Sequence, residues 1–328
     1  MIVYDVRVDA LTSMLDHLRS SGALVGTNIL TPPWAIRFED TAPLTIISMI
    51  RGESWLIPAT VGPGDDGSPV RLLRGDLAVI SGHAPFTVTS DPEAGIEPLY
   101  VLNDPTTCTD GSGRVLDPGE LMLGVRSCGA RLDGEHAMLA ATYRTTGAAA
   151  ERVLSALPRL VLVPQSGRST PLRLIEDEIA RDQPGQQAVL DRLLDLLLVA
   201  TLRDWFALPE TDTPAWYRAM SDPVVGPTLR AIHDRPSAPW TVETLAREAN
   251  VSRAAYARRF AGLLNEAPIA YLTGWRLCLA ADLLRDTDDT VESVARQVGY
   301  ASAFALSAAF ARQFGHRPTE HRRLANGA

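Results

Sequence analysis

The chain has 328 residues, of which 46% are hydrophobic and 6% aromatic; this is a globular composition with room for about two domains. No apolar run approaches the roughly 20 residues that cross a bilayer, and Asp5, Arg7 and Asp9 stand where a secretory signal would be apolar. A cytoplasmic protein without a membrane segment is therefore expected. The three cysteines are too few for a disulfide framework and form no CxxC pair, which argues against a zinc site.

Short apolar or β-branched runs alternate with turn residues between residues 28 and 145. Such runs occupy residues 44–50, 54–59, 75–82 and 85–90. Their spacing predicts a β-barrel or sandwich, to which we assign residues 1–165. The segments RGESWL (51–56) and RGDLAVISG (74–82) resemble the cupin-type effector domain found at the N-terminus of many AraC-family regulators.

Cupin enzymes bind their metal through two or three His residues and a Glu. Here the first motif region contains no His, and the second retains only His83. One imidazole cannot make the usual site for iron, manganese or zinc, so we expect no metal, no other cofactor and no catalytic residue. A metal-dependent cupin enzyme is the disfavoured alternative function.

A pocket for a small-molecule effector is expected inside the barrel. Its candidate lining residues are Trp34, Arg37, Trp55, His83 and Tyr100, and Arg37 could meet an anionic effector. The alternative is that the Trp residues belong to the core, that Arg37 is a surface charge and that His83 lies in a turn.

Two of the cysteines form a candidate redox pair. Cys108 lies in a loop rich in Gly, Asp and Ser, and Cys128 follows a β-like segment. Oxidation could join them and make the protein a thiol-based regulator. The alternative is that both cysteines are structural or incidental.

Residues 171–207 are predicted to form two helices, broken at Asp182-Gln183-Pro184-Gly185. The second helix carries more apolar surface than one packing face needs, and a spare apolar face usually buries against another subunit. We therefore assign residues 166–207 to a helical dimerisation segment and expect a homodimer. Residues 208–224, which are rich in Pro and acidic residues, are expected to be a linker.

Charge is distributed unevenly along the chain. Residues 223–328 contain 13 Arg against 10 acidic residues, a net charge of +3, whereas residues 1–222 contain 18 Arg against 29 acidic residues, or −11. A basic C-terminal part is expected where the chain approaches a polyanion. All 31 basic residues are Arg, so every cation is a guanidinium fork suited to phosphate or guanine.

The C-terminal part contains an internal duplication. Residues 241–268 align with residues 290–318, and each copy predicts a helix, a tight turn and a second capped helix. Asn250 and Gly299 supply the two turns. The matched positions are Thr241 and Thr290, Ser252 and Ser302, Phe260 and Phe310, and Pro268 and Pro318.

A long amphipathic helix from Ile269 to about Arg285 is predicted between the two copies. Such a rigid spacer could hold the two second helices roughly 34 Å apart, which is one turn of B-DNA. A helical bundle without a ligand would explain the apolar stripes but not the repeated helix–turn–helix. Residues 225–328 are therefore predicted to be an all-α DNA-binding domain, which makes the whole an α+β multidomain chain.

The C-terminal part resembles a known family. The segments RLCLAADLL (276–284) and TEHRR (319–323), with residues 290–318 between them, closely resemble the signature of the AraC/XylS transcription regulators. Departures are Asn265, where Gly is usual, and His321, where Tyr is common. The resemblance implies a non-enzymatic regulator with double-stranded DNA as partner, and RNA polymerase is a candidate second partner.

In the first copy the resemblance implies that Ala254, Ala257 and Arg258 meet base edges. Helical periodicity also turns Arg253 outward, and Arg258 is the best candidate for reading a guanine. Arg253 and Arg259 are assigned to phosphates, although Arg259 could equally be a solvated surface charge. Ser252 is predicted to cap this helix.

In the second copy the resemblance implies base contacts from Phe304, Ser307 and Ala308. None of these side chains can read a base bidentately, so this helix is expected to clamp the DNA and to touch thymine methyl groups. Ser302 and the helix N-terminus are expected to hold a phosphate. Alternatively, Phe304 packs against a neighbouring helix or a polymerase subunit.

Overall fold

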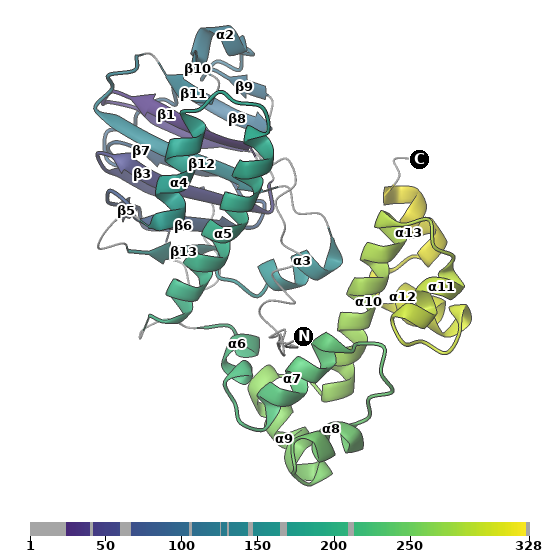
Figure 1. Cartoon of the computed structure of the whole chain (residues 1–328). Coiled ribbons are helices and arrows are strands. Elements are labelled where there is room, and N and C mark those ends of the chain that lie inside the picture. Colours follow the sequence, from purple (N-terminus) through teal and green to yellow (C-terminus); the bar gives the residue numbers. More distant parts are fainter. Residues whose placement is uncertain are drawn as a thin grey trace, which may run out of the picture. The chain divides into compact units, whose positions relative to one another are not determined.

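The contacts of the computed structural model divide the chain into two compact units (Figure 1). The model describes residues 24–39, 42–59, 67–104, 107–124, 126–129, 131–143, 147–164, 169–208 and 213–325. Within them, residues 147–153 and 213–325 form the C-terminal unit, and the others form the N-terminal unit.

Two sheets form the body of the N-terminal unit. In the described residues the first sheet has seven strands in the order β10-β11-β1-β12-β3-β6-β13, and the second has six in the order β5-β4-β7-β2-β8-β9. The first comprises β1 (Leu24–Leu30), β3 (Leu44–Arg51), β6 (Leu77–Ser81), β10 (Met122–Gly124), β11 (Ser127–Gly129), β12 (His136–Tyr143) and β13 (Leu160–Val163). The second comprises β2 (Ala35–Phe38), β4 (Ser54–Pro58), β5 (Val70–Leu72), β7 (Phe86–Thr89), β8 (Tyr100–Asp104) and β9 (Thr107–Thr109). The predicted β-rich fold is confirmed.

Strand β3 is apolar on both faces because both faces are covered. Ile47 and Met49 belong to the core shared by the two sheets, whereas Leu44 and Ile46 alternate with them and are also buried. Helices α4 (Thr170–Ile179) and α5 (Gln186–Phe206) lie across the outer face of this sheet (Figure 1). The predicted pair of helices in residues 171–207 is therefore confirmed.

A short helix inserted between β12 and β13 belongs by its contacts to the C-terminal unit. This helix, α3 (Ala148–Leu154), begins where the backbone N–H groups of Ala148 and Ala149 donate to the Asp282 carboxylate, at 2.7 and 3.2 Å. Arg152 Nη2 donates to Glu266 Oε1 at 3.1 Å. The prediction that residues 1–165 form one domain is corrected here, because these contacts tie residues 147–153 to the helical unit.

The predicted linker, residues 208–224, is also corrected. Residues 215–220 form helix α6 (Ala215–Met220), which buries Trp216 and Ala219. Asp222 then caps the next helix by accepting hydrogen bonds from the N–H groups of Val224 and Val225, both at 2.9 Å. Most of this segment is therefore packed structure of the C-terminal unit.

The C-terminal unit contains the predicted duplication. Its helices are α7 (Val225–Asp234), α8 (Val242–Glu248), α9 (Arg253–Leu264), α10 (Pro268–Asp286), α11 (Val291–Gln297), α12 (Ala303–Phe314) and α13 (Pro318–Ala325). Asn250, Asn265 and Gly299 have φ values of 55°, 56° and 83°, and the left-handed turns they form tolerate Asn and Gly best. Thr241, Ser252, Thr290 and Ser302 each cap a helix through the side-chain oxygen, which confirms the predicted cap at Ser252.

Each helix–turn–helix unit has its own core against α10. In the first, Phe260 lies with its ring centroid 5.8 Å from that of Tyr271. In the second, Leu306 and Phe310 pack with Leu284. No helix in the described part of the chain combines the length and the apolar character that a membrane crossing requires.

Two phenylalanines of α12 provide a matched stability test, because Phe310 is 0% exposed and Phe304 is 84% exposed. Phe310→Ala is expected to lower the free energy of unfolding of the C-terminal unit by about 3–5 kcal/mol, since it leaves a cavity. Phe304→Ala is expected to change it by less than about 0.5 kcal/mol. Hydrogen exchange of the α12 amides measures both, and equal effects would contradict the described burial.

Candidate nucleic-acid interface

Helix α9 presents a polar, basic surface on the side away from its core. Tyr256 and Phe260 face inward and are fully buried. The opposite side exposes Ser252, Arg253, Ala254 and Arg258, and Ala257 between them is half-buried. The residues predicted to read DNA in the first copy therefore lie on one outward surface of the helix.

The two neighbouring arginines of α9 have different surroundings. Arg259 Nε donates to Asp222 Oδ1 at 3.0 Å, and Arg259 Nη2 lies 2.8 Å from Oδ2, so the pair is bidentate. Arg258 has no ion pair among the described residues and borders a groove of about 340 Å³ that Val224 and Val251 also line. Arg258 is thus available to a ligand, whereas Arg259 joins α9 to the residues that precede α7.

The electrostatics of Asp222 agree with this structural role. Burial raises the pKa of its carboxyl group, but hydrogen bonds from Arg259 and from two backbone N–H groups outweigh burial and leave the pKa below its usual range. The carboxylate is therefore ionised at neutral pH. It orients both the start of α7 and the guanidinium of Arg259.

Helix α12 presents a surface of different chemistry. Phe304 and Ala308 are exposed, and Ser302 and Ser307 are half-buried. The outward face is thus largely apolar, with small side chains around one projecting ring. This arrangement fits contact with methyl groups or with another apolar surface better than bidentate recognition of a base.

The N-terminus of α12 already carries an anion from the chain itself. Glu292 Oε2 accepts a hydrogen bond from the N–H of Ala303 at 2.9 Å, and Ser302 Oγ accepts one from Ala305 at 3.2 Å. A phosphate was expected at this position, and it would have to displace or share donors with the Glu292 carboxylate. In the first copy the equivalent Glu243 instead pairs with Arg247 at 3.6 Å.

Neither Asp222 nor Glu292 is among the site residues predicted from the sequence. The sequence could have indicated Glu292, because it occupies the position in the second copy that Glu243 occupies in the first. No sequence signal indicated Asp222, since it lies in the segment predicted to be a linker and its partner is 37 residues away.

The predicted pocket residues of the N-terminal unit differ in burial. Trp34 is 0% exposed and Tyr100 is 3% exposed, and both belong to the core between the sheets. Trp34 Nε1 donates to His136 Nδ1 at 3.1 Å, and the Tyr100 hydroxyl donates to Asn28 Oδ1. Both residues are therefore buried in the core between the sheets, and their part in an effector pocket stays a prediction.

The other three candidates lie nearer the surface. Arg37 Nε donates to Glu39 Oε1 at 2.8 Å, and both side chains are well exposed. Trp55 is half-buried beneath the guanidinium of Arg71, whose Cζ lies 5.8 Å from the ring centroid. His83 is exposed in the turn between β6 and β7.

The cysteines predicted to form a redox pair are free and half-buried. Burial raises the pKa of both the Cys108 and the Cys128 thiol, and the charge of Cys128 raises that of Cys108 further. Protonated thiols react slowly, whereas reactive cysteines have a lowered pKa. Cys128 Sγ lies 3.7 Å from the Sδ of Met122. In the described residues no group of three His, Cys, Asp or Glu side chains could hold a metal.

Comparison with known proteins gives matches along nearly the whole chain. Residues 9–207 match the Cupin family, and residues 245–324 match the Helix-turn-helix domain family. An AraC-like transcription regulator from Streptomyces lividans is 31% identical over 327 residues, covering 96% of this chain and 98% of the relative. Another from Streptomyces antibioticus is 30% identical over 324 residues, covering 96% and 99%.

Among solved structures, the DNA-binding domain of AdpA, crystallised in complex with a target DNA, is 34% identical. It covers 33% of this chain and 96% of its own, with a TM-score of 0.31. The full-length relatives and the two matched families agree with the order of a β-rich unit followed by a duplicated helix–turn–helix. The chain therefore belongs to the AraC-like transcription regulators that carry an N-terminal cupin domain.

Proposed function

We propose that the chain regulates transcription by binding double-stranded DNA, with α9 reading bases and α12 clamping the duplex. The observation that carries the proposal is the exposed Arg258 on the outward face of a capped helix, next to an arginine that is already paired. A guanidinium in the major groove reads guanine bidentately. The two Streptomyces relatives, named as AraC-like transcription regulators, support the same activity. Binding to chromosomal DNA would place the protein in the cytoplasm.

Arg259 is proposed to position α9 rather than to hold a phosphate. Its guanidinium is engaged by Asp222 on two atoms, and the same carboxylate caps α7. A phosphate would have to compete with a carboxylate held in place by backbone N–H groups. Arg253, which is exposed in the first turn of α9, is the better candidate for a phosphate contact.

Phe304 is proposed to lie against DNA, where its ring can contact thymine methyl groups. A ring that is 84% exposed on a well-packed helix contributes little to the fold. Ser307 and Ala308 beside it are small, so a duplex can approach the helix closely. The alternative occupant of this surface is a subunit of RNA polymerase.

The cupin unit is proposed to bind a small-molecule effector and to signal through α3. This helix follows β12 and precedes β13, two strands of one sheet, while Ala148 and Arg152 contact residues of the DNA-binding unit. A change in the sheet that moved the end of β12 or the start of β13 would displace α3. An effector could in this way shift the equilibrium between two arrangements of the regulator.

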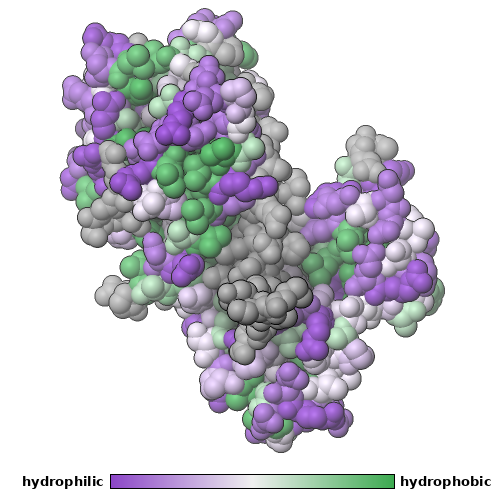
Figure 2. Space-filling view, viewed as in Figure 1, coloured by the Kyte–Doolittle hydropathy of each residue, from purple (hydrophilic) through white to green (hydrophobic). Residues whose placement is uncertain are grey.

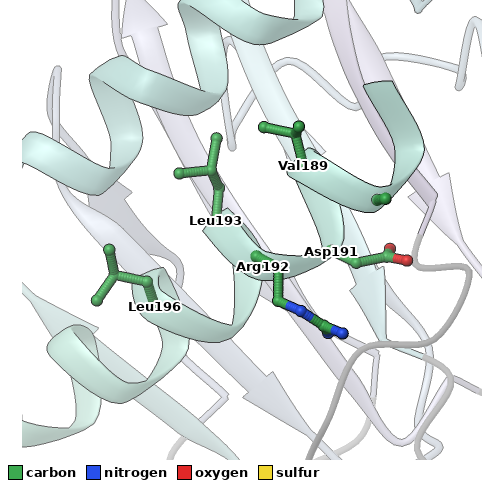
Figure 3. Close-up of a pocket in the computed structure, with 6 residues that line it drawn as sticks. Val189, Asp191, Arg192, Leu193 and Leu196 are labelled. Atoms are coloured by element: carbon green, nitrogen blue, oxygen red, sulfur yellow. The ribbon is translucent and has the colours of Figure 1, made fainter. Parts of the chain in front are cut away.

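A homodimer is proposed to form through α5. Val189, Leu193 and Leu196 follow one another at helical spacing and line a hollow of about 600 Å³ with Asp191 and Arg192 at its edge (Figure 3). Figure 2 shows the corresponding hydrophobic patch over the α4 and α5 region of the N-terminal unit. An apolar strip edged by one acid and one base is self-complementary, as a two-fold interface requires.

Replacing Arg258 tests base reading. The full chain is first used to enrich binding sites from a random duplex library. Arg258→Ala is then expected to weaken binding to the enriched site by about 5- to 150-fold, equivalent to about 1–3 kcal/mol, with little change on random DNA. Arg247→Ala is the matched control, because the Arg247 side chain on α8 is 74% exposed. Equal losses on both DNAs would remove Arg258 as the base reader.

Paired substitutions of Arg259 and Asp222 distinguish the two roles considered for Arg259. If Arg259 positions α9, Arg259→Ala and Asp222→Asn are expected to weaken DNA binding to a similar degree and to leave its salt dependence unchanged. If Arg259 instead holds a phosphate, Arg259→Ala alone should reduce the slope of log Kd against log salt concentration by about 1. Titrations at several salt concentrations separate the two results.

The dimer proposal is tested with two exposed leucines of the N-terminal unit, Leu196 at 50% and Leu73 at 47% exposure. Leu196→Asp is expected to weaken dimerisation by roughly 100-fold, because an unpaired carboxylate would be buried in the interface. Leu73→Asp lies outside α5 and should leave the dimer intact. Analytical ultracentrifugation measures both, and a monomeric wild type would contradict the proposal.

A further inference from the structure

Arg276 joins the two helix–turn–helix units directly. It lies on α10, and its Nε donates to the carbonyl of Pro236 at 2.7 Å. Its Nη2 donates to the carbonyl of Ala238 at 2.7 Å, and its Nη1 donates to that of Gly299 at 3.2 Å. Pro236 and Ala238 belong to the segment between α7 and α8 of the first unit, whereas Gly299 makes the turn of the second unit.

The two units also meet backbone to backbone at this point. Gly299 has a φ of 83°, and a Cβ built on it would lie 2.7 Å from both Cα and O of Ser237. Only glycine therefore allows the turn of the second unit to approach the 236–238 segment so closely. The units are thus connected twice, once by the covalent continuity of α10 and once by this contact.

The segment that accepts from Arg276 is itself held in place. Trp240 Nε1 donates to the carbonyl of Arg235 at 2.9 Å, and the Arg235 guanidinium lies over the Trp240 ring with its Cζ 5.1 Å from the centroid. Arg276 is half-buried, and burial lowers the pKa of its guanidinium, although that of an arginine stays far above neutrality. A charged fork is therefore held among three carbonyl oxygens of two units.

We propose that Arg276 is a positioning residue that fixes the angle between the two helix–turn–helix units and thereby sets the spacing of the two DNA boxes one protomer accepts. The proposal rests on the proposed DNA-binding function. Successive grooves along B-DNA repeat every 10–10.5 base pairs, so one inserted base pair turns the second box by about 35° and moves it by about 3.4 Å. If the angle between the two helix–turn–helix units is fixed, the protein binds such a site weakly. If the angle can change, the second unit can follow the displaced box.

The chemistry specifically requires arginine. A guanidinium has five donors in a planar fork and can reach three separate carbonyls, whereas an ammonium group is a compact point charge. Met keeps the aliphatic part of the side chain and removes every donor. Arg276→Met therefore releases the two units from each other while leaving α10 itself apolar enough to pack, and Arg276→Lys is the milder variant.

The experiment uses the full chain and the duplex that wild type enriches from a random library. Affinity is measured for that duplex and for versions with one base pair added or removed between the two boxes. Wild type is expected to lose about tenfold on each altered duplex, as for a mismatched site. Arg276→Met should lose less than about threefold, with Arg276→Lys in between, and Arg247→Met should behave as wild type.

A measurement without DNA makes the proposal independent of the enriched site. Spin-labelled unnatural residues at the exposed positions 254 and 308 report the distance between α9 and α12 by double electron–electron resonance. Labelled chain is diluted with unlabelled chain, so that only the distance within one protomer is measured. Wild type is then expected to give one narrow distribution, and Arg276→Met, or Arg276→Lys if the first variant does not fold, is expected to give a broad one. An unchanged distribution, or an unchanged spacing penalty, overturns the role of Arg276. If wild type enriches no duplex, but wild type gives the narrow distribution and the Arg276 variant the broad one, the DNA-binding function is contradicted. The role of Arg276 in fixing the angle between the two helix–turn–helix units is then still supported.

Discussion

The burial of one helix, α10, is the constraint on which the whole C-terminal unit depends. Its first half buries Tyr271 and Trp275 against the first helix–turn–helix unit, and its second half buries Ala281 and Leu284 against the second. The short helices of either unit could not bury their apolar faces without it, because isolated helices of this length are marginal. A single 19-residue helix therefore supplies both cores and fixes the distance between them.

The duplicated units share a fold but differ in chemistry, and the difference lies at corresponding positions. Arg258 in α9 aligns with Ala308 in α12, so a charged fork is replaced by a methyl group. The Glu preceding each second helix also differs, because Glu292 binds the helix N-terminus while Glu243 pairs with Arg247. Removing a cation and adding a local carboxylate both weaken attraction to phosphate. The second unit is thus suited to shape and methyl contacts, and we propose that sequence choice rests mainly on the first.

Local features were predictable from the sequence, whereas long-range partners were not. The cap at Ser252 and the turn at Asn250 depend on residues within three or four positions, so the sequence predicted them correctly. The pairing of Arg259 with Asp222 joins residues far apart in a segment that resembled a linker. Alternation along a strand likewise indicates that a side chain such as Trp34 points inward, but not whether the interior beside it is hollow.

A fixed angle between the two helix–turn–helix units restricts how an effector could control this regulator. If α10 and Arg276 hold α9 and α12 at one angle, then a signal from the cupin unit cannot change the spacing of these two helices within a protomer without breaking buried contacts. The contacts of α3 support this view, because Asp282 lies near the end of α10 and Glu266 lies just before its start, so α3 contacts both halves of the C-terminal unit. A displacement of α3 therefore moves the two helix–turn–helix units together. We therefore propose that an effector controls DNA binding by changing how the two protomers of the proposed dimer are arranged.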